Sequence, residues 1–172
     1  MALLEELDYE PKTPNVLQRG MQRIASTRPG AWMFSVTLQP VDRFLFDRTK
    51  GRVTVPGLMA GLPVVMLTTT GAKSGKQRTS PLLGVPVDGS LAVIGSNFGQ
   101  ESTPGWVFNL EADPAAVISY GDKTVDVTAR SAGHDEADAT FEAASAVYNG
   151  YAKYRERADH RVIRVFVLET AD

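Results

Sequence analysis

The sequence predicts a mainly-β domain of the α+β type, in which six antiparallel strands and inserted helices form a small closed or partly closed barrel. The length of 172 residues suits a single folded domain. From residue 63 onward, short apolar and β-branched runs alternate with turns that contain Gly or Pro. Residues 124–130 alternate polar and apolar side chains, which is typical of a strand with one face in solvent.

The first three strands are expected to form a meander with short links. Residues 64–70 are apolar and β-branched, residues 78–85 form a second short strand, and residues 90–96 form the third. Pro86 and Gly89 bound the turn that joins the last two strands.

A helix is predicted after the meander. Thr103 is placed to cap it, and Pro104 occupies the first turn, where a proline is tolerated. The helix carries Trp106 and Leu110 and ends before Pro114, because the residue before a proline disfavours helical geometry.

The C-terminal part of the chain is expected to add three strands and a second helix. Residues 115–120 and 124–130 form a hairpin around a Gly-Asp turn, and residues 161–168 form the last strand. A helix over residues 135–157 lies between them, and the Asn149-Gly150 pair can break it.

Residues 1–62 differ in composition from the barrel segment, residues 63–172. Two prolines punctuate an acidic start, and a helix is predicted over residues 15–26. Large apolar side chains then gather between Trp32 and Phe46. This helical or irregular segment is expected to pack on the barrel as part of one folded domain, and a lid or a contact with a membrane surface is the alternative.

Composition argues against several classes of function. The net charge of −2 speaks against binding of nucleic acid. The absence of cysteine excludes disulfides and thiolate metal sites and fits a cytoplasmic protein. His134 and His160 stand among charged residues, so both are expected to be solvated and no metal site is predicted. The sequence shows neither a membrane-spanning apolar run nor a signal peptide.

Residues 71–81 (GAKSGKQRTSP) are the strongest candidate for a binding site. They carry Lys73, Lys76 and Arg78 and no acid, and their glycines let backbone N–H groups approach an anion. Arginine can hold a phosphate through two parallel hydrogen bonds. The glycine spacing and the strand-to-strand context do not match a Walker A loop, which speaks against nucleotide hydrolysis. A solvated hairpin tip is the alternative reading.

Four motifs stand in order along the second part of the chain. They are residues 65–83 (VMLTTTGAKSGKQRTSPLL), residues 95–99 (GSNFG), residues 104–110 (PGWVFNL) and the pair of segments at 112–114 and 128–130. Tyrosines at 148, 151 and 154 follow them. Together these segments resemble the signature loop, the further motifs and the C-terminal tyrosine cluster of the deazaflavin (coenzyme F420)-dependent nitroreductase family. The resemblance covers about residues 62–168.

The resemblance implies a split β-barrel related to flavin-binding oxidases. Reduced deazaflavin would pass a hydride to an organic acceptor, such as an activated alkene (enone), a quinone or a nitroaromatic. The basic loop would hold the phosphate and glutamate tail, and the end of the third strand would line the ring. The coenzyme-binding residues so implied are Ala72, Lys73, Ser74, Arg78, Thr79, Ser80, Pro81, Leu82, Leu83, Ile94, Gly95, Ser96, Asn97, Gly105, Trp106 and Asn109.

The chain departs from the family pattern at several positions that bear on the site, including Val107-Phe108 in place of a usual Tyr-x pair. Ala72 replaces a usual arginine, so Lys73 and Arg78 must carry most of the anion binding. Leu83 stands where some members have tyrosine, and Gly105 stands where a bulkier residue is common. The last two changes affect the shape of the acceptor pocket.

Tyr148, Tyr151 and Tyr154 recur every three residues and share one broad face of a helix. They are interpreted as substrate-binding residues, with Tyr151 as the catalytic group that protonates the acceptor after the hydride arrives. Simple aromatic packing is the alternative. Trp106 has the alternative role of a core anchor, and Arg161 is expected to be a surface ion-pair partner.

The favoured hypothesis is therefore an F420-dependent reductase with a small-molecule acceptor. The first alternative is a non-catalytic binder of the coenzyme or of a fatty-acid-like molecule. The second is an FMN-dependent enzyme on the same barrel. A monomer is favoured over a dimer, and the N-terminal segment is the place where a peripheral membrane contact would form.

Overall fold

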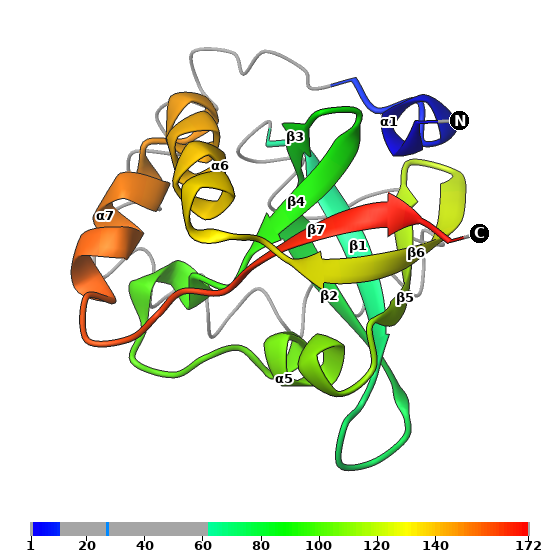
Figure 1. The fold of residues 1–172 in the computed structure, drawn as a ribbon, viewed down its shortest axis with the longest axis horizontal. Helices are drawn as coiled ribbons and strands as arrows, with labels where there is room; N and C mark the ends of the chain where they lie inside the picture. The colour runs from blue at the N-terminus through cyan, green and yellow to red at the C-terminus, as the bar shows by residue number, and fades with distance from the viewer. Residues whose placement is uncertain (1, 11–26, 28–61, 172) are drawn as a thin grey trace.

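In the described part of the chain, seven strands form one antiparallel sheet that curls on itself and is flanked by helices (Figure 1). The computed structural model describes residues 2–10, 27 and 62–171. The strand order is β2-β1-β5-β6-β7-β4-β3. The strands are β1 (Val64–Thr70), β2 (Gln77–Leu83), β3 (Val85–Val87), β4 (Ser90–Ile94), β5 (Ala115–Tyr120), β6 (Lys123–Ser131) and β7 (Val165–Thr170). The helices are α1 (Leu3–Glu6), the 3-10 turn η1 (Asn97–Gly99), α5 (Gly105–Ala112), α6 (His134–Val147) and α7 (Gly150–Arg157).

The sheet closes toward a barrel at Gly84. Its two edge strands, β2 and β3, are consecutive in the chain and only Gly84 separates them. The chain therefore crosses from one edge of the sheet to the other at this residue. A Cβ at position 84 would lie 3.0 Å from the Tyr9 hydroxyl and 3.2 Å from a Val65 methyl group, so a side chain here would press on both groups.

The predicted barrel of mainly-β class is confirmed, and the predicted number of six strands is wrong. The predicted strand over residues 78–85 is two strands, because the chain bends at Gly84. Pro86 was expected in a turn and instead belongs to β3, where it pairs with Leu91. An edge strand accepts a proline, because its outer N–H makes no ladder bond.

Strand β4 is buried on both faces because its side chains alternate between two apolar clusters. Leu91 and Val93 join the cluster that contains Val65 and Ile118. Ala92 and Ile94 join a second cluster, which contains the aromatic side chains of α6 and α7. The neighbouring strand β7 alternates in the same way. This two-sided burial explains why both strands appear in the sequence as nearly continuous apolar runs.

The N-terminal residues 3–10 pack against the sheet at Gly84. Leu3 and Leu7 are almost completely buried in the first cluster. The Tyr9 hydroxyl donates a hydrogen bond of 2.6 Å to the carbonyl of Gly84. Figure 1 shows α1 on the side of the molecule away from α5 and the β1–β2 loop. The predicted helix over residues 15–26, and most of the predicted segment 1–62, lie outside the described residues.

Some predicted element boundaries differ from the observed ones, and one predicted helix break is confirmed. Helix α5 begins at Gly105 with Pro104 as its N-cap, so Thr103 does not cap it. The predicted helix over residues 135–157 is divided into α6 and α7, and the expected break near Asn149-Gly150 is confirmed. The last strand begins at Val165, four residues later than expected, because Arg161 and Arg164 make contacts outside the sheet.

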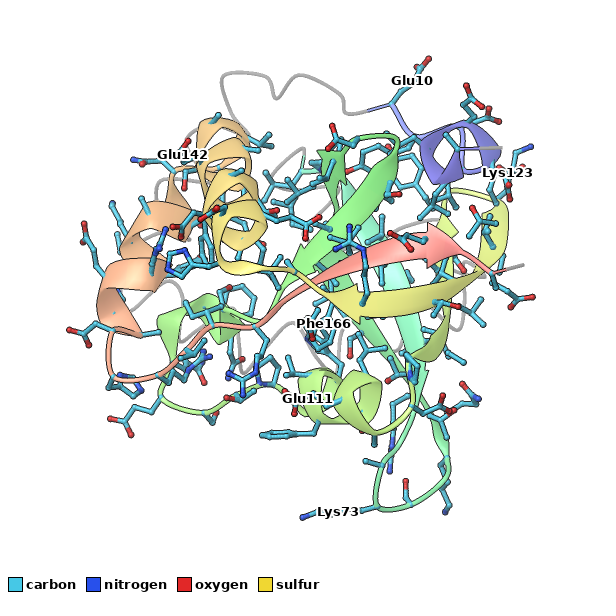
Figure 2. The ribbon with its side chains drawn as sticks, in the orientation of Figure 1. Glu10, Lys73, Glu111, Lys123, Glu142 and Phe166 are labelled. Carbon is cyan, nitrogen blue, oxygen red and sulfur yellow. The ribbon has the colours of Figure 1, made fainter. Side chains whose placement is uncertain are left out.

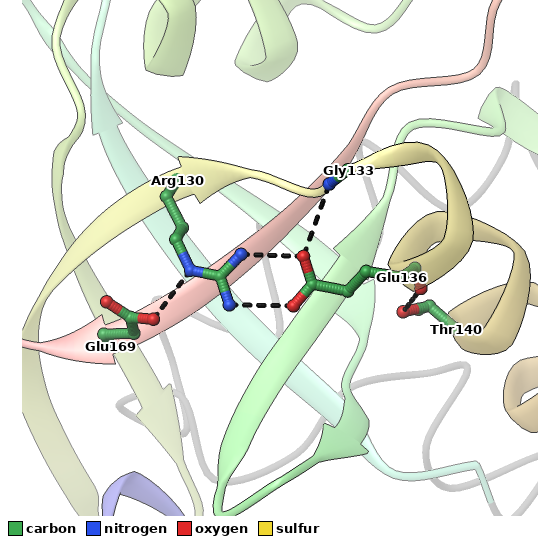
Figure 3. Close-up of polar contacts among 5 residues, drawn as sticks. All are labelled: Arg130, Gly133, Glu136, Thr140 and Glu169. Atoms are coloured by element: carbon green, nitrogen blue, oxygen red, sulfur yellow. Dashed lines mark hydrogen bonds and ion pairs between the residues drawn. The ribbon is translucent and has the colours of Figure 1, made fainter.

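A group of charged residues fixes the start of α6 against the sheet (Figure 3). The Arg130 guanidinium donates two hydrogen bonds of 2.7 Å to Glu136 and one of 2.7 Å to Glu169. Glu136 also accepts a bond of 3.3 Å from the N–H of Gly133, which is one half of a capping box. Helix α6 is thereby tied to β6 and β7. None of the described helices is long and apolar enough to cross a membrane.

Candidate functional site

The loop between β1 and β2 is a compact turn that its own backbone holds together. The N–H of Gly71 donates to the carbonyl of Lys76 at 2.8 Å, and the N–H of Gly75 donates to the carbonyl of Gly71 at 2.7 Å. Gly75 has a φ of +64°, which glycine adopts at little cost. A Cβ on Gly71 would lie 2.6 Å from the Ser74 hydroxyl oxygen. Gly75 is therefore favoured by the shape of this loop, and a side chain at Gly71 would displace the Ser74 hydroxyl.

The charged side chains of the loop are exposed and have no partner among the described residues. Neither an ion pair nor a side-chain hydrogen bond is formed by Lys73, Lys76 or Arg78 within the described part of the chain. Figure 2 shows Lys73 at the tip of the loop, pointing into solvent. Three unpaired cations on a rigid loop form a surface that suits an anionic ligand.

Asn109 of helix α5 anchors the loop to the body of the protein. Its Oδ1 accepts a hydrogen bond of 3.0 Å from the backbone N–H of Ala72. Its Nδ2 donates one of 2.9 Å to Oγ1 of Thr69, whose hydroxyl is turned toward the Arg78 carbonyl at 3.5 Å. The amide that was predicted to bind the coenzyme is thus already engaged, and it sets the position of the basic loop.

The end of β4 lies directly against α5. A Cβ on Gly95 would come within 2.8 Å of a Val107 methyl group. Ser96 follows and is 5% exposed. Asn97 and Phe98 then have φ values of +47° and +56°, and Gly99 one of +73°. Left-handed geometry costs a residue with a side chain about 1–2 kcal/mol, so other contacts must stabilise this turn.

Arg161 supplies those contacts, and its role was not foreseen from the sequence. Its guanidinium donates to the carbonyls of Gly95 at 3.2 Å, Ser96 at 2.9 Å and Gln100 at 3.3 Å. Hydrogen bonds from a charged donor stabilise by about 1.5–3 kcal/mol each, which is enough to offset the strain in the turn. Partial burial lowers the pKa of Arg161. The expectation of a surface ion pair is wrong, because no carboxylate of the described residues reaches this side chain.

The three tyrosines pack together under η1. The hydroxyls of Tyr148 and Tyr154 are 3.0 Å apart, and the rings of Tyr148 and Tyr151 meet edge to face with centroids 6.1 Å apart. Phe98 of η1 lies edge-on to Tyr154 at 6.0 Å. A Cβ on Gly150 would collide with the Tyr148 ring, so this glycine permits the cluster to form.

Two buried hydroxyl groups in this region have no hydrogen-bond partner among the described residues. One belongs to Tyr151, which is 7% exposed, and the other to Ser96. Ile94, two residues before Ser96, packs in the same apolar cluster as Tyr151. Burial raises the pKa of Tyr151, and the neighbouring Tyr148 adds to the effect. A buried hydroxyl that lacks a partner is rare in folded proteins and points to a group supplied from outside.

The predicted site residues form a continuous path across one edge of the molecule. Asn109 joins the basic loop to α5, Val107 of α5 contacts Gly95, and η1 leads to Tyr154. Figure 1 shows the β1–β2 loop, α5 and η1 in succession along this edge. Thr79, Ser80, Pro81, Leu82 and Leu83 extend along β2 from the loop.

Some predicted site residues have structural roles. Trp106 is 6% exposed and packs edge-to-face on Phe166 at 6.0 Å, so it leaves little surface for a ligand. The Asn97 amide donates to the carbonyl of Ser102 at 2.9 Å. Gly105 is exposed with open space around it. Within the described residues, no group of His, Asp and Glu side chains is arranged to hold a metal ion.

The curled antiparallel sheet, with a helix inserted after β4 and a helix pair before β7, places the chain in the class of split-barrel proteins. The chain belongs to the F420H(2)-dependent quinone reductase family, which matches residues 43–170. The predicted resemblance to F420-dependent reductases is therefore confirmed.

Individual relatives agree with this assignment. An F420H(2)-dependent quinone reductase of Mycobacterium tuberculosis is 34% identical over 88 residues, which are 50% of this chain and 57% of that protein. The chain thus matches little more than half the length of this curated relative. The solved structure of an F420-H2 dependent reductase, FDR-A, is 41% identical with a TM-score of 0.57, over 62% of this chain and 94% of the other. A protein solved as a domain-swapped dimer is 37% identical with a TM-score of 0.58, over 76% of this chain and all of the other.

Proposed function

We propose that this protein is an F420H2-dependent reductase that transfers a hydride from the reduced deazaflavin coenzyme to a quinone. Family membership supports the coenzyme and the general reaction. The observation that carries the proposal is the pair of buried hydroxyls at Ser96 and Tyr151 without partners in the described residues. Enones and nitroaromatics are further acceptors that the same chemistry allows.

The residues present fit this coenzyme at both of its ends. Its phosphodiester and glutamate tail are anionic, and Lys73, Lys76 and Arg78 are unpaired cations within the described structure. Its ring is flat and carries polar edges, and the end of β4 offers Gly95 and the Ser96 hydroxyl beside the apolar Ile94. The basic loop stands at one end of the path and the tyrosines at the other (Figure 1), an order that suits a ligand with charges at one end and a ring at the other.

When bound, the reduced coenzyme supplies the hydride and its two electrons. The protein orients the acceptor and excludes water. Tyr151 donates a hydrogen bond to the acceptor oxygen, which gains negative charge as the hydride arrives. Because burial raises its pKa, Tyr151 stays protonated at neutral pH and remains a donor. Once the hydride has added to the quinone, one proton taken up from solvent, directly or relayed by Tyr151, completes the two-electron reduction to a hydroquinone.

Anaerobic mixing of the protein with chemically reduced F420 and a soluble quinone tests the proposal. Appearance of the oxidised coenzyme's absorbance, at a rate proportional to protein concentration, is the expected result. An enone and a nitroaromatic in parallel reactions rank the acceptors. A competitive titration of F420 against FMN decides between the coenzymes. Tight F420 binding with no turnover across the acceptors would instead show a binding protein.

Two further proposals concern the surroundings of the enzyme. The protein acts as a monomer in the cytoplasm. A similar structure was solved as a domain-swapped dimer, so size-exclusion chromatography with light scattering is the test of the oligomeric state. The N-terminal segment, residues 1–62, is where a lid or a membrane contact is proposed, and co-sedimentation with lipid vesicles tests the latter.

A further inference from the structure

Arg161 differs in what it binds from three other arginines of the described chain, which form ion pairs. Arg130, Arg155 and Arg164 pair with carboxylates. Arg161 instead donates only to backbone carbonyls, those of Gly95, Ser96 and Gln100. Half-burying a guanidinium without a counter-charge is unfavourable, so this arrangement calls for a compensating role.

The hydrogen bonds of Arg161 set the direction of two peptide groups. The described chain has no cis peptide bond, and in a trans peptide the N–H and the C=O point in opposite directions. The guanidinium holds the Gly95 and Ser96 carbonyls, so the N–H groups of Ser96 and Asn97 face away from Arg161. Neither N–H group has an acceptor within the described residues.

Arg161 also holds together two parts of the site that are distant in sequence. It follows α7, which carries Tyr151, and it binds the turn that carries Ser96. The turn contacts α7 a second time, since a Cβ on Gly99 would lie 3.1 Å from the Tyr154 Cα. One side chain therefore sets the position of the Ser96 hydroxyl relative to the tyrosines.

We propose that Arg161 is a positioning residue, which aims the N–H groups of Ser96 and Asn97 and the Ser96 hydroxyl at polar atoms of the deazaflavin ring or of the acceptor bound against it. Its guanidinium does not contact the ligand. The inference rests on the proposed function and adds to it the backbone donors and the residue that orients them. It also separates ring recognition, through Arg161, from tail recognition, through Arg78.

The test uses two probes and three variants of the whole chain. The probes are coenzyme F420 and the deazaflavin chromophore with its ribityl chain but without phosphate or glutamate tail. Arg161→Gln removes the charge and most donors, and Arg161→Lys keeps the charge and fewer donors. Arg164→Gln is the matched control, because it removes an exposed ion pair with Glu111 from the same segment. Dissociation constants, kcat, KM and melting temperature are measured for each.

Arg161→Gln is expected to weaken binding of both probes by about tenfold and to lower kcat, because a small displacement of catalytic donors is costly. Arg161→Lys is expected to recover part of both losses, and Arg164→Gln to stay within about twofold of the wild type for both. The inference is wrong if Arg161→Gln binds the tail-less chromophore and turns over like the wild type. It is also wrong if both Arg161 variants only lower the melting temperature or do not fold. A wild-type protein that binds neither probe would overturn the proposed function itself.

Discussion

The side chain of Asn109 holds the backbone of Ala72, with its Oδ1 3.0 Å from the Ala72 nitrogen. This bond connects α5 to the loop that carries the unpaired cations. Where the family pattern has an arginine, this chain has an alanine whose backbone alone contributes a contact. Helix α5 therefore positions the loop, and the positive charge of the loop comes from Lys73, Lys76 and Arg78.

Replacing Asn109 with alanine should weaken binding of coenzyme F420 by about tenfold, because the loop loses a hydrogen bond that fixes it. The tail-less chromophore should bind with little change, since the loop is proposed to hold the tail. Asn109→Asp is the matched variant: it keeps the acceptor for Ala72 and loses the donor to Thr69, so an intermediate affinity is expected. Fluorescence titration measures both ligands. An equal loss for both would instead indicate direct contact between Asn109 and the ring.

Replacing Arg78 with alanine should raise the dissociation constant of F420 by about tenfold or more, because a charge-assisted contact to the tail is lost. The dependence of affinity on salt concentration should become shallower, because one fewer charge takes part. Lys123→Ala is the control: Lys123 pairs with Asp8 at 3.4 Å and lies far from Lys73 in Figure 2. An unchanged affinity and salt dependence in Arg78→Ala would place the anion site elsewhere.

Replacing Tyr151 with phenylalanine should lower kcat by about tenfold to a hundredfold, because the acceptor oxygen loses a buried hydrogen-bond donor. Coenzyme affinity should hardly change. The fold should be retained, since the hydroxyl has no partner to lose within the described structure. Single-turnover oxidation of bound F420H2 by a quinone measures the effect. Tyr148→Phe is the comparison, because its hydroxyl contacts Tyr154 at 3.0 Å and its removal should cost stability more than rate. A wild-type kcat in Tyr151→Phe would leave the tyrosines as packing residues.

The sequence predicted the barrel well because strand and turn signals are local. The apolar run at residues 64–70 and the break at Asn149-Gly150 depend on nearby residues, and both are present. The bend at Gly84 was missed because the side chains packed against it, Tyr9 and Val65, are distant in sequence.

The site was predicted mainly through motifs, and its internal connections were not. Nothing local to Asn109 reveals that its partners are Ala72 and Thr69. Likewise, the charged neighbours of Arg161 suggested an ion pair, whereas its acceptors are carbonyls more than 60 residues away in the chain. One available signal was the segment 95–99, in which Asn97 and Gly99 tolerate left-handed geometry and so indicate a turn.

The contact between Arg130 and Glu136 should make stability depend on pH on the acid side. The Arg130 guanidinium, through its hydrogen bonds, lowers the pKa of Glu136 below the ordinary value of 4.5. When folding lowers the pKa of a carboxyl group, the stabilisation is fully present above the pKa of that group in the unfolded chain. It is lost as the pH falls from there through the pKa of the group in the folded protein. Glu136→Gln should therefore lower the free energy of unfolding by about 0.5–1 kcal/mol at neutral pH, the range for a largely exposed pair. The difference from the wild type should shrink as the pH falls below about 4.

Glu142→Gln, at an exposed position on the same helix, is the control and should show neither effect. Urea denaturation at a series of pH values measures these differences, and a Glu136→Gln deficit that persists unchanged at low pH would show that the ion pair is not its cause.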